Sequence, residues 1–229
     1  MKFDVWEPVY RRILEDFGFD RAADERARDV LAGLLADADL FDPADLDFSG
    51  RTVAVAGAAP SLPTDLDLAR EADAVVSAST AADVLRDAGV DVDLMVTDLD
   101  KNPGTGRDLT RAGVPVAVHA HGDNVPAVRE WVPEYDPAAL LPTTQAAPRG
   151  PVRNFGGFTD GDRAAFLADA LGAAQLTFPG WDFDDPAVDP AKARKLRWAE
   201  RLLYWLEIRR DERFAVLDGR RAGLERVWE

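Results

Sequence analysis

The spacing of hydrophobic and polar positions changes twice along this chain. In residues 5–38, apolar side chains recur every three or four positions, which predicts two helices separated by a break at Gly18. From Thr52 onward, short apolar runs alternate with helical segments, until a long helix begins near residue 189. The pattern therefore predicts an N-terminal helical segment (1–48), a central core (49–187) and a C-terminal helical segment (188–229) packed on that core.

Six short apolar runs in the central segment predict β-strands. They lie at 52–57, 72–78, 92–97, 114–120, 139–144 and 173–180, and helical patterns separate them. Their successive positions are apolar rather than alternating, as in strands that are covered on both faces. Strands that alternate with helices form parallel sheets. We therefore predict an α/β fold with a mostly parallel, Rossmann-like sheet, helices on both faces, an N-terminal helical segment and a long C-terminal helix.

Polar residues collect directly after the predicted strands. In an open parallel sheet, ligands bind beyond the carboxyl ends of the strands, so these segments are the candidates for chemistry. They read GAAPS (57–61), SAST (77–80), TDLDKN (97–102), HAHGDN (119–124) and PGWDFDD (179–185), and the loop NFGGFTDGDRA (154–164) precedes a predicted helix. The pattern predicts a polar site at one edge of the sheet.

The charge balance restricts the partners of the protein. The chain has 42 Asp and Glu against 27 Lys and Arg, a formal net charge of −15, and its lysines are at positions 2, 101, 192 and 195 alone. This composition is typical of the cytoplasm of a salt-loving organism, where screening keeps self-repulsion small; an ordinary acidic protein is the alternative. So acidic a surface disfavours nucleic acid and anionic membranes as partners.

Other absences narrow the class further. The chain has no cysteine, which excludes disulfides, thiolate catalysis and Cys–zinc sites. Its charged N-terminus is unlike a signal peptide, and no apolar run approaches the about 18 residues of a membrane span. We therefore expect a cytoplasmic protein whose partners are small molecules, and we allow for a homo-oligomer.

Two aspartates, Asp98 and Asp100, follow the third apolar run. Side chains two residues apart in an extended chain project the same way, and adjacent carboxylates repel each other unless a cation lies between them. Oxygen ligands suit Mg²⁺, which typically takes one or two carboxylates together with substrate phosphates. We predict that Asp98 and Asp100 bind Mg²⁺ with Asp123 as a third ligand; solvated turn aspartates are the alternative.

Two loops are candidates for binding phosphate, because each leads from a strand or loop into a helix, where backbone N–H groups are free. The candidates in these loops are Gly57, Ala58, Pro60, Ser61, Gly157, Thr159 and Asp160, and Thr97 at the end of the third apolar run is a further candidate. Arg163, in the first helical turn after the second loop, could pair with phosphate. Asp162 in the same turn is a candidate too, although complementarity to the helix dipole also explains it. A tight turn capped by Ser61 is the alternative for the first loop.

Both histidines of the chain lie in HAHGDN. His119 and His121 share a strand face, a spacing that zinc hydrolases use, but a dinuclear zinc site needs further histidines and the chain has none. We therefore expect no zinc catalysis. We expect His119 to be packed and His121 to act as a hydrogen-bond partner or proton acceptor.

Taken together, AGAAPSL, VTDLDKN, HAHGDN and GGFTDGDRA, in this order, resemble the archaeal 6-hydroxymethyl-7,8-dihydropterin pyrophosphokinases, the MptE-like family. The resemblance covers roughly residues 1–210, because the family also has an aromatic-rich N-terminal helical segment. This family is related in its catalytic fold to thiamin pyrophosphokinases, which use clustered aspartates with Mg²⁺. The chain departs from the family in its first loop, where Ala58 and Ala59 stand in place of a common second glycine.

The resemblance implies transfer of the β,γ-diphosphate of ATP to the hydroxymethyl oxygen of a reduced pterin, with release of AMP, in the synthesis of folate or methanopterin precursors. ATP carries about four negative charges, so it can bind at a carboxylate-rich edge only together with divalent cations such as Mg²⁺. The catalytic candidates are then His121, Asp123, Asp162 and Arg163.

The planar pterin needs polar groups at its edge and an aromatic or apolar face. Asn124, Asn154 and Asp182 are the candidates for the edge, and Trp181 is the candidate for the face. Two other functions stay open. A Mg²⁺-dependent nucleotide-sugar glycosyltransferase also places D-x-D after a strand, and a non-catalytic module would bind the nucleotide without turnover.

Overall fold

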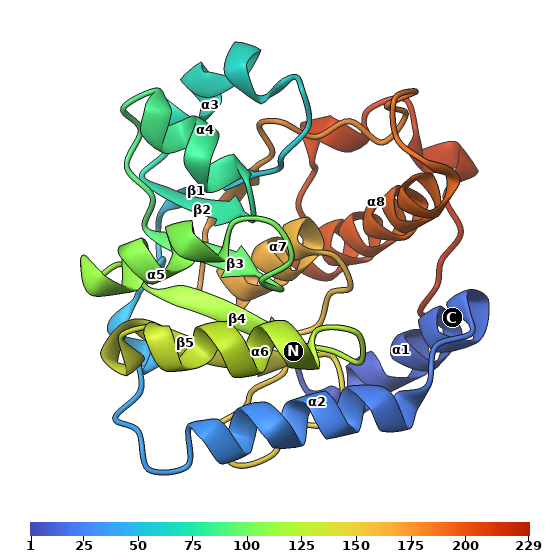
Figure 1. Ribbon diagram of the computed structural model, residues 1–229. Helices are drawn as coiled ribbons and strands as arrows, with labels where there is room; N and C mark the ends of the chain where they lie inside the picture. The colour runs from blue at the N-terminus through green and yellow to red at the C-terminus, as the bar shows by residue number, and fades with distance from the viewer.

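The computed structural model describes all residues, 1–229. Its centre is a six-stranded sheet in the order β5-β4-β3-β2-β1-β6, and all neighbouring strands are parallel (Figure 1). The strands are β1 (Thr52–Ala56), β2 (Ala74–Ala78), β3 (Leu94–Thr97), β4 (Val116–Ala120), β5 (Leu140–Thr144) and β6 (Gln175–Thr177). All six predicted strands are present, and the predicted α/β fold with its parallel sheet is confirmed.

Eight α-helices surround the sheet. They are α1 (Phe3–Phe17), α2 (Arg21–Leu34), α3 (Leu66–Arg70), α4 (Ala81–Asp87), α5 (Pro103–Arg111), α6 (Val125–Trp131), α7 (Asp160–Ala170) and α8 (Pro190–Arg210). The predicted break at Gly18 is confirmed, and its φ of 69° is a left-handed conformation that glycine adopts without steric strain. None of the helices combines the length and the apolar character that crossing a bilayer requires.

Alternate residues of each strand enter different cores, because successive side chains point to opposite faces of the sheet. In β1, Val53 and Val55 pack with α1, α7 and α8, whereas Ala54 and Ala56 pack with α3 and α4. A further cluster joins α2, α5 and α6 to β3 and β4. Both faces are therefore covered by helices, which is why the strands are apolar at successive positions.

The order of the strands decides where the sheet opens. Strands β1 to β5 follow one another across the sheet, and then α7 crosses back over β1, β2 and β3 to place β6 beside β1. The chain therefore leaves β1 and β6 toward different layers, α3 on one side and α8, packed on α7, on the other. Such a change of direction leaves a crevice at the carboxyl ends of the strands.

Candidate active site

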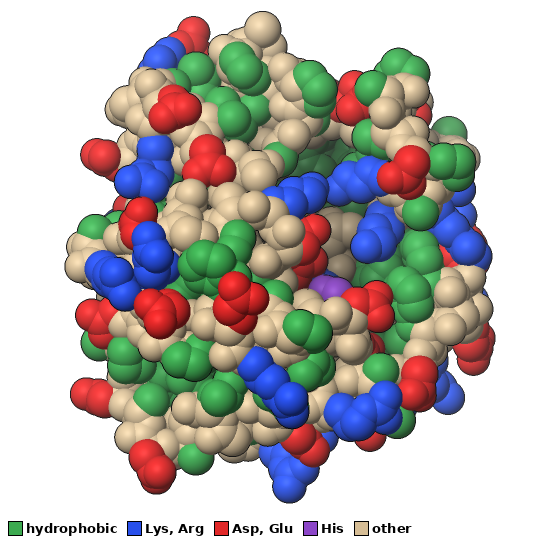
Figure 2. Space-filling view, viewed as in Figure 1, with side chains coloured by type: hydrophobic (Ala, Val, Ile, Leu, Met, Phe, Trp, Pro, Cys, Tyr) green, Lys and Arg blue, Asp and Glu red, His purple; other side chains and the backbone are tan.

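A cavity of about 620 Å³ lies at this edge. Its walls come from the segments that follow all six strands, and from the starts of α2, α7 and α8. Figure 2 shows it as a hollow in the middle of the molecule, with Lys and Arg side chains along one rim and with Asp or Glu and a histidine inside. The polar edge that the sequence predicts and the cavity therefore coincide.

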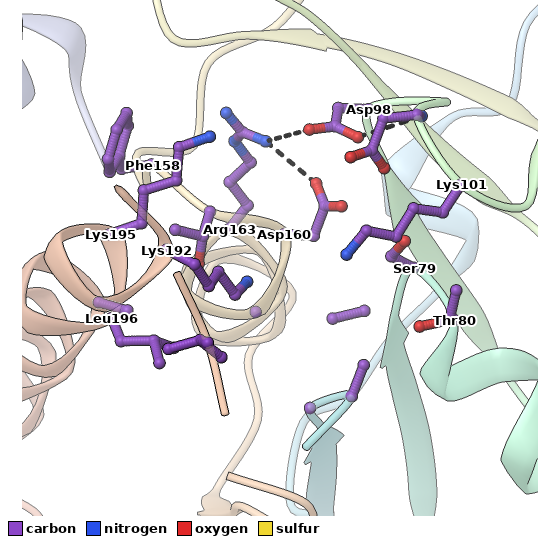
Figure 3. Close-up of a pocket in the computed structure, with 18 of the residues that line it drawn as sticks. Ser79, Thr80, Asp98, Lys101, Phe158, Asp160, Arg163, Lys192, Lys195 and Leu196 are labelled. Atoms are coloured by element: carbon purple, nitrogen blue, oxygen red, sulfur yellow. Dashed lines mark hydrogen bonds and ion pairs between the residues drawn. The ribbon is translucent and has the colours of Figure 1, made fainter. Parts of the chain in front are cut away.

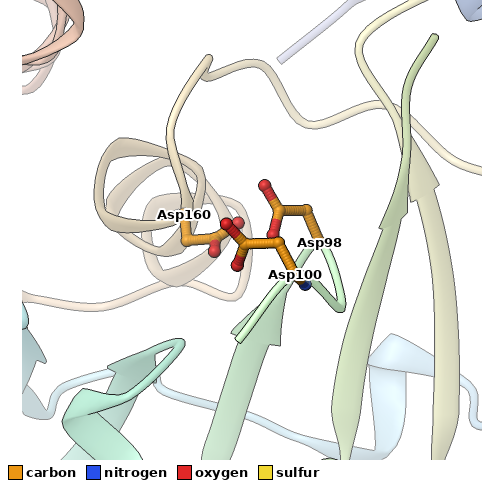
Figure 4. Close-up of side chains that lie close together, drawn as sticks. All are labelled: Asp98, Asp100 and Asp160. Carbon is orange, nitrogen blue, oxygen red and sulfur yellow. The ribbon is translucent and has the colours of Figure 1, made fainter. Parts of the chain in front are cut away.

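Three carboxylates converge in the cavity. Asp98 and Asp100 follow β3, Asp160 begins α7, and one oxygen of each lies within 4.8 Å of the others (Figure 4). Asp123, the third ligand expected from the sequence, is exposed and lines the cavity without belonging to this group. The difference arises because the crossing of α7 over the sheet brings its first residue to the end of β3.

A turn, not an extended strand, pairs the first two carboxylates. β3 ends at Thr97, and Leu99 has a φ of 68°, a left-handed conformation that is uncommon for a non-glycine residue. The hydroxyl of Thr97 accepts the Leu99 N–H at 3.0 Å, and Leu99 is buried in the core. The expectation of side-by-side projection from an extended chain was therefore wrong in its reason, although the two carboxylates do meet.

The three carboxylates differ in their ionisation. Burial opposes the charge on Asp98, but the hydrogen bond from His121 and the charge of Arg163 bring its pKa well below the usual value. Burial and the neighbouring Asp98 raise the pKa of Asp100. Burial and the Asp98 charge also raise the pKa of Asp160 to about 7. This mutual repulsion between oxygen donors is what a hard divalent cation relieves, so the residues fit Mg²⁺.

Arg163 stands beside the carboxylates and is itself buried (Figure 3). Its Nη1 donates to Asp160 at 3.0 Å and lies 4.0 Å from an oxygen of Asp98. Its Nη2 donates to Gln145 Oε1 at 3.3 Å. The sequence predicts Arg163 as a partner of phosphate, and the structure places it as a buried counter-ion within the carboxylate group.

The N-terminal helices support this arginine through a chain of hydrogen bonds. Gln145 donates to Asp24 of α2 at 2.8 Å, and the Tyr10 hydroxyl of α1 donates to the same carboxylate at 2.7 Å. The backbone N–H of Gly122 donates to the other oxygen of Asp24 at 2.7 Å. The helical pattern of residues 5–38 predicts packing alone for this segment. The sequence does contain a sign of this role, because a carboxylate, Asp24, lies on the apolar face of α2 with Ala27 and Leu31.

Trp181 forms another wall of the cavity, and its close packing accounts for the glycines at positions 57 and 161. Its indole N–H donates to the carbonyl of Val55 at 2.8 Å. A Cβ on Gly57 would lie 2.5 Å from the carbonyl oxygen of Gly180, and a Cβ on Gly161 would lie 2.9 Å from the indole ring. These glycines are therefore required by close packing around residues 180 and 181, whether or not a ligand approaches them.

The structure divides the predicted site residues into two sets. Those that line the cavity are Gly57, Ala58, Pro60, Asp98, Asp100, His121, Asp123, Thr159, Asp160, Arg163 and Asp182. Those outside its lining are Ser61, Thr97, Asn124, Asn154, Gly157 and Asp162. Lys101, Lys192 and Lys195 also line the cavity and are not among the predicted site residues, although the rarity of lysine in the sequence is a signal for them.

Hydrogen bonds show what the residues outside the lining do. Asp162 accepts from the hydroxyl and the backbone N–H of Thr159, and so caps α7. The amide of Asn124 donates to the carbonyl of Asp98 at 2.8 Å and thereby fixes the turn after β3. The amide of Asn154 donates to the carbonyl of Ala146 at 2.8 Å. These side chains hold the loops around the cavity in place.

Fold and site together define an α/β protein of the Rossmann-like class with an acidic candidate metal site at the carboxyl ends of its strands. Residues 35–187 match the family described as 6-hydroxymethylpterin diphosphokinase MptE-like. The chain therefore belongs to the MptE-like family, and the resemblance drawn from the motifs is confirmed.

Curated archaeal relatives extend the match over nearly the whole chain. A 6-hydroxymethyl-7,8-dihydropterin pyrophosphokinase of Methanothermobacter thermautotrophicus is 41% identical, with 93% of this chain and 98% of the relative covered. Proteins of the same name from Pyrococcus furiosus and Methanocaldococcus jannaschii are 36% and 31% identical. Each alignment covers 90% of this chain, and 95% and 96% of the respective relative.

Proposed function

We propose that this protein transfers the β,γ-diphosphate of ATP to the hydroxymethyl group of 6-hydroxymethyl-7,8-dihydropterin and releases AMP. Family membership and the names of the three relatives support the diphosphokinase activity. The observation that carries the proposal is the group of Asp98, Asp100 and Asp160 in a cavity of about 620 Å³. This volume lies within the range of about 300–1,000 Å³ that is usual for small-molecule sites.

In the reaction, the hydroxymethyl oxygen bonds to the β-phosphorus, and the bond from that phosphorus to the bridging α,β-oxygen breaks. AMP leaves with the bridging oxygen, and the hydroxymethyl proton passes to a base. Asp98, Asp100 and Asp160 would hold a divalent cation, which would supply positive charge against the phosphates. Mg²⁺ is the cation that we propose. The protein itself mainly has to position the two substrates and compensate the charge.

His121 is the residue that we propose as proton acceptor. Its Nε2 lies 3.4 Å from an oxygen of Asp98, so the carboxylate orients the ring. In the tautomer that donates through Nε2, the Nδ1 atom carries a lone pair that can accept the proton of the hydroxymethyl group. His121 also lines the cavity, as this role requires.

We infer that the pterin lies at the α2 end of the cavity, beside His121. The side chains of Phe19 and Phe158 line that end, with ring centroids 6.5 Å apart, and offer apolar faces to a planar ring. Asp182, the residue that the sequence suggests for the pterin edge, follows β6. Three strands separate β6 from β4, about 19 Å at the usual strand spacing, so we place Asp182 and His121 at different ends of the cavity.

The nucleotide then takes the other end, near Gly57, Ala58 and Trp181, with its phosphates reaching the carboxylates. Asp182 is next to this end, because Trp181 packs against Gly57. We therefore propose that Asp182 contacts the nucleotide. This arrangement places the reacting phosphorus between the two substrates, close to Asp98 and His121.

The test is an assay of purified protein with ATP, Mg²⁺ and 6-hydroxymethyl-7,8-dihydropterin at high salt, with AMP and the pterin diphosphate measured by chromatography. We expect AMP and pterin diphosphate in equal amounts, and none with chelator present. Binding of ATP without any turnover of the pterin would contradict the proposal and favour a non-catalytic module. Release of a nucleoside diphosphate from a nucleotide-sugar would favour the glycosyltransferase.

A further inference from the structure

Lysine is rare in this chain, and it is concentrated in one place. The chain has four lysines among 27 basic residues, and three of the four, Lys101, Lys192 and Lys195, line the cavity. Lys101 follows the carboxylate turn after β3, and the other two lie in the first two turns of α8. The match to the family ends at residue 187, before the two lysines of α8. A random distribution over a surface does not explain this placement.

None of the lysines has a carboxylate partner. The ion pairs of the structure are formed by arginines, apart from the one between His121 and Asp98. In a chain with a net charge of −15, carboxylates are plentiful enough to pair every cation. Lys2 is also unpaired but lies alone outside the cavity, whereas three unpaired ammonium groups gather at the cavity, which points to an anionic ligand as their partner.

The position of Lys192 and Lys195 is also unfavourable for the helix that carries them. The N-terminal end of a helix has a partial positive charge, which favours carboxylates and disfavours cations. The first turn of α8 holds no acidic residue, and both lysines are partly buried. Burial, followed by the nearby Lys101, lowers the pKa of Lys192. Helix stability thus gives no reason for these lysines, and an anionic ligand would remove both penalties.

Lys101 and Lys192 face each other across the cavity, and Lys195 lies one turn further along α8. Figure 3 shows the ends of Lys101 and Lys192 directed toward the space between them, while Lys195 extends from α8 toward Arg163. The carboxylates of Asp98 and Asp160 border the same space. A ligand that fits carries several negative charges on one side and shares a divalent cation with the carboxylates on the other. A polyphosphate meets both conditions.

We propose that Lys101, Lys192 and Lys195 form a binding site for a polyphosphate chain, which we call the lysine cradle. It takes the phosphate oxygens that face away from the carboxylates. That the lysine cradle binds the β- and γ-phosphates of ATP in particular rests on the proposed function. Because the diphosphate is the part that changes partner in the reaction, the same cradle then holds it in ATP and in the pterin product.

The first experiment measures binding of inorganic tripolyphosphate with Mg²⁺ by calorimetry at fixed salt. The variants are Lys101→Gln and the double variant Lys192→Gln/Lys195→Gln, and Lys2→Gln, at an exposed lysine outside the cavity, is the matched control. Each lost charge-assisted contact should weaken binding by about tenfold. We expect unchanged affinity for Lys2→Gln and an about hundredfold loss for the double variant. Wild-type affinity in the double variant would overturn the cradle.

The second experiment needs no variant, so it remains decisive if a substituted protein fails to fold. The wild-type protein is acetylated with and without Mg²⁺-tripolyphosphate, and the rate at each lysine is followed by mass spectrometry. We expect the polyphosphate to slow acetylation at positions 101, 192 and 195 and to leave Lys2 unaffected. If Mg²⁺-tripolyphosphate leaves the acetylation rate of each of the three cavity lysines unchanged, the proposal is overturned.

The enzyme assay separates the two proposals from each other. If the wild-type protein makes no AMP with the pterin, yet tripolyphosphate protects the three lysines, the cradle is correct and the proposed function is wrong. If AMP is made while the double variant keeps its KM for ATP and its affinity for tripolyphosphate, the function is correct and the cradle is wrong. Lys192→Arg keeps the charge and should keep most of the affinity.

Discussion

The two sides of the cavity are built differently. On the acidic side, Asp98 comes from the turn after β3, and Asp160 and Arg163 come from α7; Arg163 lies beside both carboxylates. On the basic side, Lys101, together with the two lysines of α8, has no carboxylate partner. Contacts within the protein therefore hold the acidic side in place before a ligand arrives, whereas the basic side has no such ion pairs.

The acidic side is therefore preorganised, whereas the lysines of the basic side can change position when a ligand binds. Carboxylates held by a turn and by buried hydrogen bonds keep their geometry, so a cation bound there costs little reorganisation. A lysine has a flexible four-carbon stem and a single point charge, so it can follow a phosphate chain as the chain changes partner. Partly exposed charges are also screened more strongly by salt than buried ones. The acidic side therefore suits catalysis, and the basic side suits binding.

The largest effect should come from the acidic side. Asp160→Asn removes a carboxylate from the group of three and should lower kcat for AMP release by about a thousandfold, the scale of losing one preorganised charge contact. Asp123→Asn, at the exposed residue of the same cavity, is the matched control and should stay within a few-fold. If Asp123→Asn costs as much, Asp123 belongs to the metal ligands. Unfolding curves check that both variants fold.

The second-largest effect should come from breaking the hydrogen-bond chain that holds Arg163. Gln145→Leu keeps the approximate volume of the side chain but removes one buried hydrogen bond from Asp24 and one from Arg163. We expect the free energy of unfolding to fall by about 2–3 kcal/mol, as for unsatisfied buried polar groups. Gln175→Leu, at an exposed glutamine of β6, is the control and should change little.

For the same substitution we expect kcat to fall by about ten- to a hundredfold, with a smaller change in KM, because the arginine is less well positioned. Steady-state kinetics at saturating Mg²⁺ measures both quantities. An unchanged kcat in a destabilised variant would show that the chain from Tyr10 to Gln145 supports the fold alone.

The pH dependence of cation binding should be of intermediate size. The pKa of Asp160 is about 7, because of burial and the Asp98 charge. Below that pH a proton competes with the cation, so Mg²⁺ affinity should rise as pH increases from 6 to 8, by at most about tenfold per unit for one proton. Calorimetry in two buffers of different ionisation enthalpy should detect proton release near pH 7. No release would contradict the role of Asp160.

Rising pH should increase Mg²⁺ affinity but decrease the folding stability of the cation-free protein. The pKa of Asp160 in the folded state exceeds the unfolded value of about 3.9. Below about pH 4 both states are protonated, and the group has no effect. As pH rises toward 7 the unfolded state gains by ionising first, so the cation-free protein loses stability. Asp160→Asn should remove that part of the pH dependence.

The smallest effect concerns the β6 edge of the cavity. Asp182 is exposed, so Asp182→Asn should raise one KM by a few-fold and leave kcat nearly unchanged. We expect the KM for ATP to change and the KM for the pterin to stay constant. The reverse result would move the pterin to the Trp181 end and contradict the placement beside His121. Asp184→Asn, an exposed aspartate outside the cavity, is the control.

The sequence by itself determined the elements of the fold. Strands buried on both faces are apolar at successive positions, and amphipathic helices repeat every three to four residues, so both patterns are local. Strand order was beyond such patterns, because it depends on α7 crossing back to place β6 beside β1. The pairing of Asp98 with Asp100 was predictable because the two residues are neighbours in the chain.

Only the tertiary structure decided the rest of the site. Asp160 joins the carboxylates because α7 begins opposite the end of β3, and the sequence suggested Asp123 instead. Asp24 reaches Gln145 because α2 docks against β4 and β5, far away in the chain. The lysines of α8 face the cavity because that helix packs on α7. These contacts join distant segments, and no periodicity along the chain encodes a distance between them.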